Sequence, residues 1–263
     1  MIASLGACAA VAASAAPVAI ADSAVVHGRV IKTSAREVLP THGGTATSLN
    51  WSGYVVPGSG ITAVTSTSVV PKAGLVPPGF TATWTGIGGW TSSDLIQAGV
   101  SENTLPTNPI TGAQYGAWYE ILPATETPVS NCAGNTACTV KPGDSVTVAI
   151  HQTSPGQWSI SIADPTEGWT FNKSLAYSSS GSSAEWILEA PTVIVQTIPA
   201  NTGTAHFGPT STYTDSTGTH TIAQGNPTTV DMGPGLLLNE ATPSPLAADG
   251  QSFNVCTYAQ TCS

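Results

Sequence analysis

Glu185 is the residue whose setting most suggests chemistry. It lies in the apolar stretch 183–189, Ser-Ala-Glu-Trp-Ile-Leu-Glu, between a Ser-rich loop and Pro191, and this pattern is typical of a short β-strand bounded by turns. A carboxylate among apolar residues must be solvated, paired or chemically active. Because most strand carboxylates are only solvated, the local pattern alone favours a Glu185 that faces water.

Gln97 is the candidate partner that changes this interpretation. It follows a Trp- and Gly-rich stretch, residues 84–90, and comes two residues before Gly99, so it could also be a polar residue in a turn. A Glu carboxylate can take a proton from water as a general base. A Gln carboxamide can orient that water through its C=O group and donate from its NH2 group to the oxyanion that forms. If the fold brings Gln97 and Glu185 together, they could activate a water molecule for hydrolysis without a covalent intermediate.

Other hydrolytic signatures are absent from the sequence. It has no H-E-x-x-H zinc motif, no G-x-S-x-G nucleophile motif and no His/Cys cluster with metal-ligand spacing. The Asp-Ser-Thr-Gly stretch at 215–218 has no second copy, whereas an aspartic peptidase needs two carboxylates that share a proton. His151, His206 and His220 stand alone in polar contexts and are interpreted as solvated or structural. We therefore expect neither a metal nor a cofactor.

Charged side chains are scarce, and most of them are acidic. They make up 8% of the 263 residues, with 6 Lys and Arg against 15 Asp and Glu and a net charge of −9, whereas about 25% is typical of soluble domains. A basic surface for nucleic acid is therefore not expected. A chain with few bases and few ion pairs gains little positive charge in acid and has few paired carboxylates to protonate. The composition predicts a protein that stays folded at low pH.

The first 46 residues differ in character from the rest. Residues 1–21 are small and apolar and end in Ala-Ile-Ala, as in a secretory signal peptide, so we expect secretion. Cys8, in Leu-Gly-Ala-Cys, is an alternative point of lipid attachment. Residues 22–46 are basic and poorly patterned; they could form a pro-segment that covers an acidic cleft, a linker, or a disordered tail. No later apolar run reaches the roughly 18 residues of a membrane-spanning helix.

Four cysteines lie in two closely spaced couples, Cys132 with Cys138 and Cys256 with Cys262. Their spacing does not fit C-x-x-C zinc or redox motifs, and two short disulfide loops would fit export to an oxidising compartment. Four cysteines allow three connectivities, so local pairing is an inference from proximity in the sequence.

From residue 47 to residue 263 we expect one domain built of short β-strands. Turn residues separate the apolar and alternating runs, and no run keeps a helical period of 3.6 residues. With 27 Gly and 20 Pro, this pattern predicts an all-β fold, an antiparallel sandwich or barrel. The expected strands cover residues 50–56, 64–70, 80–87, 115–121, 145–150, 158–162, 169–171, 183–189, 191–195, 204–207 and 252–255.

Six short motifs together resemble the glutamic peptidases, or eqolisins. Each motif is weak alone, but the six occur in that family's order, within a resemblance that covers roughly residues 50–258. The motifs are Asn50-Trp-Ser-Gly-Tyr54, Trp84-x-Gly-Ile-x-Gly89, Leu95-Ile-Gln-Ala-Gly99, Tyr115-Gly-Ala-Trp-Tyr-Glu120, Pro142-Gly-Asp144 and Ala184-Glu-Trp-Ile-Leu-Glu189.

The resemblance implies a sandwich of two large antiparallel sheets, similar to legume-lectin-like (concanavalin-like) folds, and an acid-active endopeptidase that cleaves polypeptides. An acid optimum fits a carboxyl group near the reference Glu pKa of about 4.3. The basic segment before residue 46 resembles the family's inhibitory pro-segment, so the chain's own pro-segment is an expected partner, and a monomer is expected. On the matching positions, Gln97 and Glu185 would form the catalytic dyad, and Trp51, Trp84, Trp118 and Glu120 would line the cleft.

One departure and several alternatives stay open at this point. Many family members have Asp where this chain has Gly88, and the missing acid could shift the pH optimum or the peptide preference. Glu189, on the same strand face as Glu185 by even spacing, is a less favoured catalytic residue. A carbohydrate-binding module could use the tryptophans as sugar platforms, and a glycosidase would need Glu120 or Glu189 about 5 to 9 Å from Glu185. Neither has an evident need for a Gln opposite a Glu, so Gln97 discriminates among these functions.

Overall fold

The computed structural model describes residues 25–29, 31–32, 39–104, 112–193, 195–233 and 240–263. The expected signal peptide, residues 1–21 with Cys8, lies outside these ranges. Within them, no helix has the length and apolar character needed to cross a membrane.

The described chain is built almost entirely of β-strands. Its only described helix is a single 3-10 turn, η2 (Ala223–Gly225). The strands are β1 (Val25–Val26), β2 (Thr45–Ser48), β3 (Trp51–Pro57), β4 (Ala63–Val69), β5 (Ala82–Gly88), β6 (Leu95–Asn103), β7 (Gln114–Ile121), β8 (Thr127–Pro128), β9 (Ser145–Ser154), β10 (Gln157–Asp164), β11 (Trp169–Ala176), β12 (Ser183–Glu189), β13 (Thr192–Val193), β14 (Val195–Gln196), β15 (Thr204–Phe207), β16 (Thr212–Asp215), β17 (Gly218–Thr221), β18 (Thr228–Met232), β19 (Ala241–Pro243) and β20 (Phe253–Thr257).

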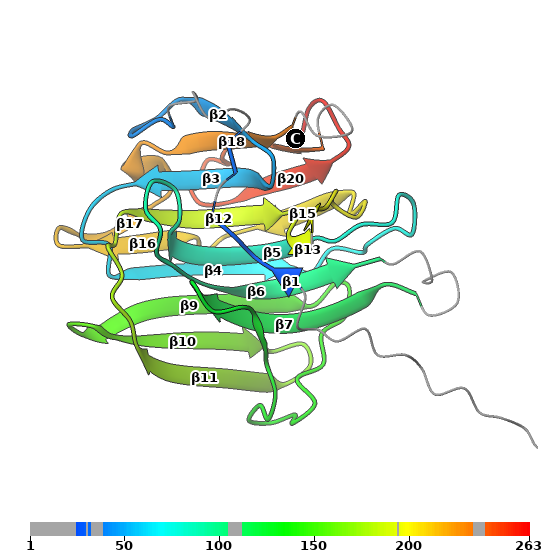
Figure 1. The fold of residues 1–263 in the computed structure, drawn as a ribbon, viewed down its shortest axis with the longest axis horizontal. Coiled ribbons are helices and arrows are strands. Elements are labelled where there is room, and N and C mark those ends of the chain that lie inside the picture. Colours follow the sequence, from blue (N-terminus) through cyan, green and yellow to red (C-terminus); the bar gives the residue numbers. More distant parts are fainter. Residues whose placement is uncertain (1–24, 30, 33–38, 105–111, 194, 234–239) are drawn as a thin grey trace, which may run out of the picture.

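Two layers of antiparallel strands form a β-sandwich (Figure 1). The front sheet runs in the order β7-β6-β5-β12-β3-β18-β2, with only the β18–β2 pair parallel. The back sheet runs β11-β10-β9-β4, and the far edge of β4 carries β16 and β15. Pairings of β15 with β20, β20 with β19, and β19 with β18 join the layers at one side. The predicted all-β sandwich of two large sheets is confirmed.

The core lies between the layers and explains the strand patterns. Back-sheet strands alternate buried and exposed positions, as in β10, because only one face packs on the core. Every residue of β12 is buried, since both faces of the front sheet are covered. Trp186 belongs to the core between the layers and donates its Nε1–H to the Thr65 carbonyl, 2.9 Å away on the back sheet.

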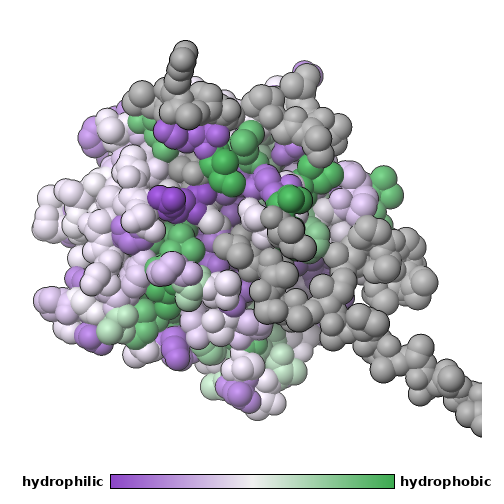
Figure 2. Space-filling model, viewed as in Figure 1, coloured by the Kyte–Doolittle hydropathy of each residue, from purple (hydrophilic) through white to green (hydrophobic). Residues whose placement is uncertain are grey.

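The second face of the front sheet carries a smaller aromatic cluster that includes Trp51, Trp84, Trp90 and Trp118. This face is called the cleft face below. On the face drawn in Figure 2, much of the coloured surface is pale, with scattered purple and green patches, as expected for a chain in which 8% of residues are charged.

Both disulfides connect neighbours in the sequence. Cys132 is bonded to Cys138 and Cys256 to Cys262, which is the local pairing that proximity suggested. Each closes a short loop at the surface or edge of the domain rather than linking the two sheets.

Candidate active site

A row of side chains crosses the cleft face at the centre of the front sheet. The register pairs Glu185 with Gly86, Gly86 with Gln97, and Gln97 with Glu120. Directly opposed residues of antiparallel strands project to the same face. The register therefore brings Glu185, Gln97 and Glu120 together on one face, with only a glycine between the first two.

Gly86 sets the distance between the two predicted dyad residues. Adjacent strands lie about 4.8 Å apart, so the Cα atoms of Gln97 and Glu185 are about 10 Å apart across two spacings. Glycine has no side chain to fill the space between them. Any larger residue would crowd this space, because its Cβ atom would lie only 3.0 Å from Gln97 Cβ and 3.0 Å from Trp84 Cζ3. Two extended polar side chains that lean over this gap can contact one small molecule.

The Glu185 carboxyl group is fully buried. Among the described residues, neither of its oxygen atoms has a hydrogen-bond partner. Burial raises its pKa well above the ordinary value, the Asp94 carboxylate adds to the rise, and the polar groups of Ser183 and the Gly88 backbone oppose it. The alternative of a water-facing strand carboxylate is therefore wrong for Glu185 in this structure.

Gln97 is also fully buried, in the middle of β6 rather than in a turn. Its Nε2 donates to Glu120 Oε2 at 2.7 Å and to the His27 carbonyl oxygen at 3.3 Å. A backbone carbonyl can only accept, which fixes the orientation of the amide. Gln97 Oε1 is buried and has no partner among the described residues, so the amide has an acceptor left for a further hydrogen bond.

Glu120 is a neutral acid in this setting. Burial raises its pKa to about 8; the His27 side chain and the hydrogen bond from Gln97 lower it, and the charge of Glu189 raises it further. Glu120 therefore holds the Gln97 amide while itself protonated below about pH 8.

Glu189 lies on the cleft face but is already engaged. Its Oε2 accepts from Trp84 Nε1 at 2.8 Å, and its Oε1 accepts from Asn50 Nδ2 at 3.3 Å. Because both oxygens already accept hydrogen bonds, we assign Glu189 to orienting the aromatic cluster and not to activating water. Trp51 packs edge-on against Trp84, with ring centroids 5.0 Å apart.

Gly88, the departure from the family pattern, is required by the backbone. Its φ of +96° is a conformation that side chains rarely adopt, and a Cβ atom would collide with the Asp94 carbonyl. A negative charge near Glu185 comes instead from Asp94, whose carboxylate raises the pKa of Glu185. The Asp94 carboxylate accepts from the Ser180 N–H at 2.7 Å.

A residue that sequence reasoning did not single out occupies the cleft face. The side chain of His27 is fully buried and stacks on Trp118, with ring centroids 3.7 Å apart and planes 4° from parallel. Its Nε2 lies 2.6 Å from Glu126 Oε2, and its Nδ1 lies 3.4 Å from Glu189 Oε2. The only sequence signal was its position in a basic segment ahead of an acidic domain.

The backbone beside His27 is held as firmly as the side chain. Gly28 N–H donates to Glu189 Oε1 at 3.0 Å, and the Gly28 carbonyl accepts from Trp51 Nε1 at 3.0 Å. The preceding strand, β1, pairs with β13. Figure 1 shows this blue segment crossing in front of the front sheet. In its described part the segment 22–46 is therefore docked on the domain and is not a disordered tail.

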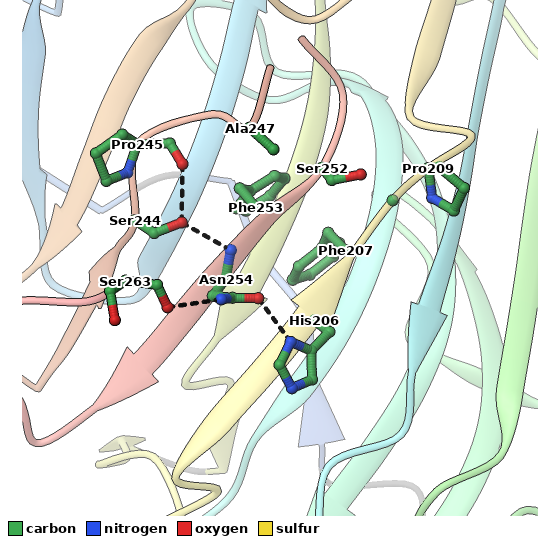
Figure 3. Close-up of a pocket in the computed structure, with 11 residues that line it drawn as sticks. His206, Phe207, Pro209, Ser244, Pro245, Ala247, Ser252, Phe253, Asn254 and Ser263 are labelled. Atoms are coloured by element: carbon green, nitrogen blue, oxygen red, sulfur yellow. Dashed lines mark hydrogen bonds between the residues drawn. The ribbon is translucent and has the colours of Figure 1, made fainter. Parts of the chain in front are cut away.

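A separate pocket lies away from this row of residues. It has a volume of about 480 Å³ and is formed by β15, β20 and adjoining loops, with no Asp or Glu side chain in its lining. Figure 3 shows His206 Nδ1 facing Asn254 Oδ1, 2.6 Å away. Neither Gln97 nor Glu185 contributes to it, so this pocket is separate from the predicted dyad.

A model of the Peptidase A4 family matches residues 49–242, and no curated protein sequence matches the chain significantly. The structure is similar to scytalido-glutamic peptidase with a transition state analog inhibitor, at 20% identity and a TM-score of 0.64, covering 79% of this chain and 98% of that one.

Two further solved structures have the same fold. SCP-B, a member of the Eqolisin family in complex with the tripeptide Ala-Ile-His, matches at 19% identity and a TM-score of 0.60, over 79% of this chain and 98% of that one. Aspergilloglutamic peptidase from Aspergillus niger matches at 22% identity and a TM-score of 0.56, over 68% of this chain and 99% of that one.

Proposed function

This chain belongs to the Peptidase A4 family, and we propose that it is a secreted, acid-active endopeptidase whose Gln97 and Glu185 activate a water molecule. The proposal rests mainly on one observation, the register in which both residues flank Gly86 on the cleft face. It is further supported by the hydrogen-bonding capacity left on the Glu185 carboxyl and on Gln97 Oε1.

The chemistry follows from the two side-chain types. Ionised Glu185 takes a proton from water while Gln97 Oε1 orients that water, and the hydroxide oxygen adds to the peptide carbonyl carbon. The Gln97 NH2 group donates to the oxyanion. Protonated Glu185 then returns the proton to the leaving nitrogen as the C–N bond breaks, which yields a carboxyl group and an amine. Since Gln does not titrate, one carboxyl carries all the proton transfer.

The docked segment supports an inhibitory role for the chain's own N-terminal residues. His27 and Gly28 occupy the cleft face through contacts with Gln97, Trp118 and Glu189, so a substrate could not lie there at the same time. Burial in this covered state keeps the Glu185 carboxyl protonated. When the segment leaves, water can enter the cleft, lower the desolvation of Glu185 and allow it to ionise in the acidic range.

The test of the proposed function is an acid incubation followed by mass spectrometry. The full chain at roughly pH 3–4, close to the reference Glu pKa, should digest an added unfolded protein and release its own N-terminal segment, with cleavage between Glu37 and Asn50. Metal chelators should not slow the digestion. Complete failure to cleave any polypeptide across the acidic range would contradict the proposal.

Replacing Gly86 with Ala tests the gap between the two side chains. The added methyl group would lie 3.0 Å from Gln97 Cβ and 3.0 Å from the Ile96 carbonyl. We expect kcat/KM to fall about 10- to 100-fold, with a Tm loss of a few degrees from overpacking. Gly116→Ala is the matched control, because a Cβ atom at that front-sheet position meets nothing within 4 Å. Equal activity of the two variants would show that the gap is unimportant.

A further inference from the structure

The side chain of His27 lies in a site built for a flat cation. One face of the imidazole is covered by the Trp118 ring, 3.7 Å away. Glu126 and Glu189 flank its two ring nitrogens at 2.6 and 3.4 Å. The ring is fully buried, so aromatic stacking and two carboxylates replace water around it.

The charge of the occupant agrees with these surroundings. Burial alone would lower the pKa of His27, but its interactions with Glu126 and Glu189 outweigh burial and raise that pKa to about 9. Imidazolium is therefore the form of His27 bound between Glu126 and Glu189. A neutral residue of similar size, such as Gln, would leave the carboxylates without a counter-charge.

The position of this site relative to the dyad is fixed by the backbone. The carbonyl oxygen of His27 accepts from Gln97 Nε2 at 3.3 Å, which is the group proposed to stabilise the oxyanion. The peptide bond that carries this carbonyl joins His27 to Gly28. The Gly28 N–H and carbonyl are each held, by Glu189 and Trp51 respectively. The imidazole site therefore binds the side chain of the same residue whose carbonyl oxygen accepts from Gln97, that is, the residue that precedes the peptide bond.

We propose that Trp118, Glu126 and Glu189 form a specificity site that selects peptide bonds preceded by His or Arg, and that residues 27–28 occupy the cleft in the manner of such a substrate. This inference rests on the proposed function, since it assigns the substrate preference of the same cleft. Histidine matches the observed occupant, and Arg offers a planar cation that also stacks on an aromatic ring and pairs with carboxylates. Lys lacks the planar group and should be a poorer substrate.

The hydrolysis adds only water across the selected bond. The hydroxyl oxygen joins the carbonyl carbon of the His or Arg residue, and the proton goes to the nitrogen of the following residue. Glu126 takes no part in these transfers. It acts on the bound side chain alone, so its removal should lower kcat/KM for the His and Arg peptides relative to the Gln peptide.

The test uses the full chain after acid incubation and a set of quenched fluorescent peptides that differ only in the residue before the scissile bond: His, Arg, Lys, Gln and Leu. At about pH 5, we expect kcat/KM for His and Arg to exceed that for Gln at least about 10-fold. Glu126→Gln should reduce this ratio to near unity. Glu167→Gln is the matched control, since Glu167 pairs with Lys141 at the exposed surface and should leave the ratio unchanged.

The outcomes separate the two proposals. If the parent protein cleaves the Leu peptide but shows no preference for His over Gln, the specificity site is wrong and the proposed peptidase function stands. If Glu126→Gln remains folded and keeps the parent's ratio, the assignment to Glu126 is likewise wrong. If no peptide is cleaved by the parent protein, the proposed function fails and the specificity proposal fails with it. The comparison among peptides with the parent protein needs no variant to fold.

Discussion

Glu185→Gln is expected to lower the kcat of the acid-incubated protein on an unfolded protein substrate at least about 1,000-fold. The substitution keeps the size of the side chain but removes the group that accepts a proton from water and returns it to the leaving nitrogen. KM should change little, because the substitution leaves the aromatic cluster and Glu189 in place. Peptide release followed by mass spectrometry, with kcat and KM from initial rates, checks the expectation.

Loss of fold must be excluded as the cause of that effect. Because the buried Glu185 carboxyl is held protonated, Glu185→Gln replaces one neutral group with another and should keep or raise the Tm. Glu167→Gln, at an exposed ion pair, should retain full activity. A Glu185→Gln protein that digests as fast as the parent would remove Glu185 from the mechanism.

Stability should increase as the solution becomes acidic. Burial raises the pKa of Glu102 and of Glu185 well above the ordinary value, and that of Glu120 to about 8. A carboxyl group whose folded pKa is raised contributes stability that is complete below its unfolded pKa. That contribution is lost as the pH rises through the folded pKa. The pKa of His27 is also raised, to about 9, so its contribution to stability likewise falls as the pH rises.

We therefore expect the Tm at pH 4 to exceed the Tm at pH 8 by roughly 5–10 °C. Asp94, whose pKa is lowered by hydrogen bonds from Ser180 and Ser92 against the opposing effect of burial, acts in the opposite direction but is less deeply buried. Thermal unfolding between pH 3 and pH 9 gives the measurement. Glu102→Gln should reduce the change of Tm with pH, because it removes one buried carboxyl group with a raised pKa. The Gln amide oxygen can still accept from Thr83 Oγ1, which lies 2.8 Å from Glu102 Oε1. A Tm that rises from pH 4 to pH 8 would contradict this account.

The strands of the sandwich could be predicted where local pattern and turn residues agree. The expected strands at 183–189 and 115–121 match β12 and β7 almost residue for residue. β6 was missed as a strand because Gln97 and Gly99 interrupt its apolar pattern. Short polar strands such as β16 and β17 were missed because their Thr-rich sequence resembles a loop and pairing alone makes them strands.

The candidate site could be predicted only in part. The six motifs indicated Gln97 and Glu185, but their common face depends on the registers of β12, β5 and β6, which long-range pairing sets. His27 could not be predicted, because its contact with Glu126 joins residues 99 positions apart and a single His carries little local signal. Short-range pattern indicates which residues can react, whereas tertiary packing decides which of them meet.

The rival functions are less compatible with these contacts. A sugar platform needs an exposed aromatic face, yet Trp51 packs against Trp84 and Trp90 with ring centroids 5.0 and 6.5 Å apart, contacts that do not depend on the docked segment. A two-carboxylate mechanism would pair Glu185 with Glu120, but Gln97 lies between them in the row and Glu120 is bonded to its amide. Under that mechanism Glu120 would be essential and Gln97 dispensable.

The rate of peptide release by Gln97→Ala at roughly pH 3–4, measured beside Glu120→Gln after acid incubation, tests the central claim most directly. If Gln97 and Glu185 share one water molecule, Gln97→Ala should lose at least about 100-fold in kcat. Glu120→Gln can still hold the Gln97 amide and should lose less. If Gln97→Ala releases peptides as fast as the parent and Glu120→Gln is inactive, the amide has no role and two carboxyl groups perform the reaction.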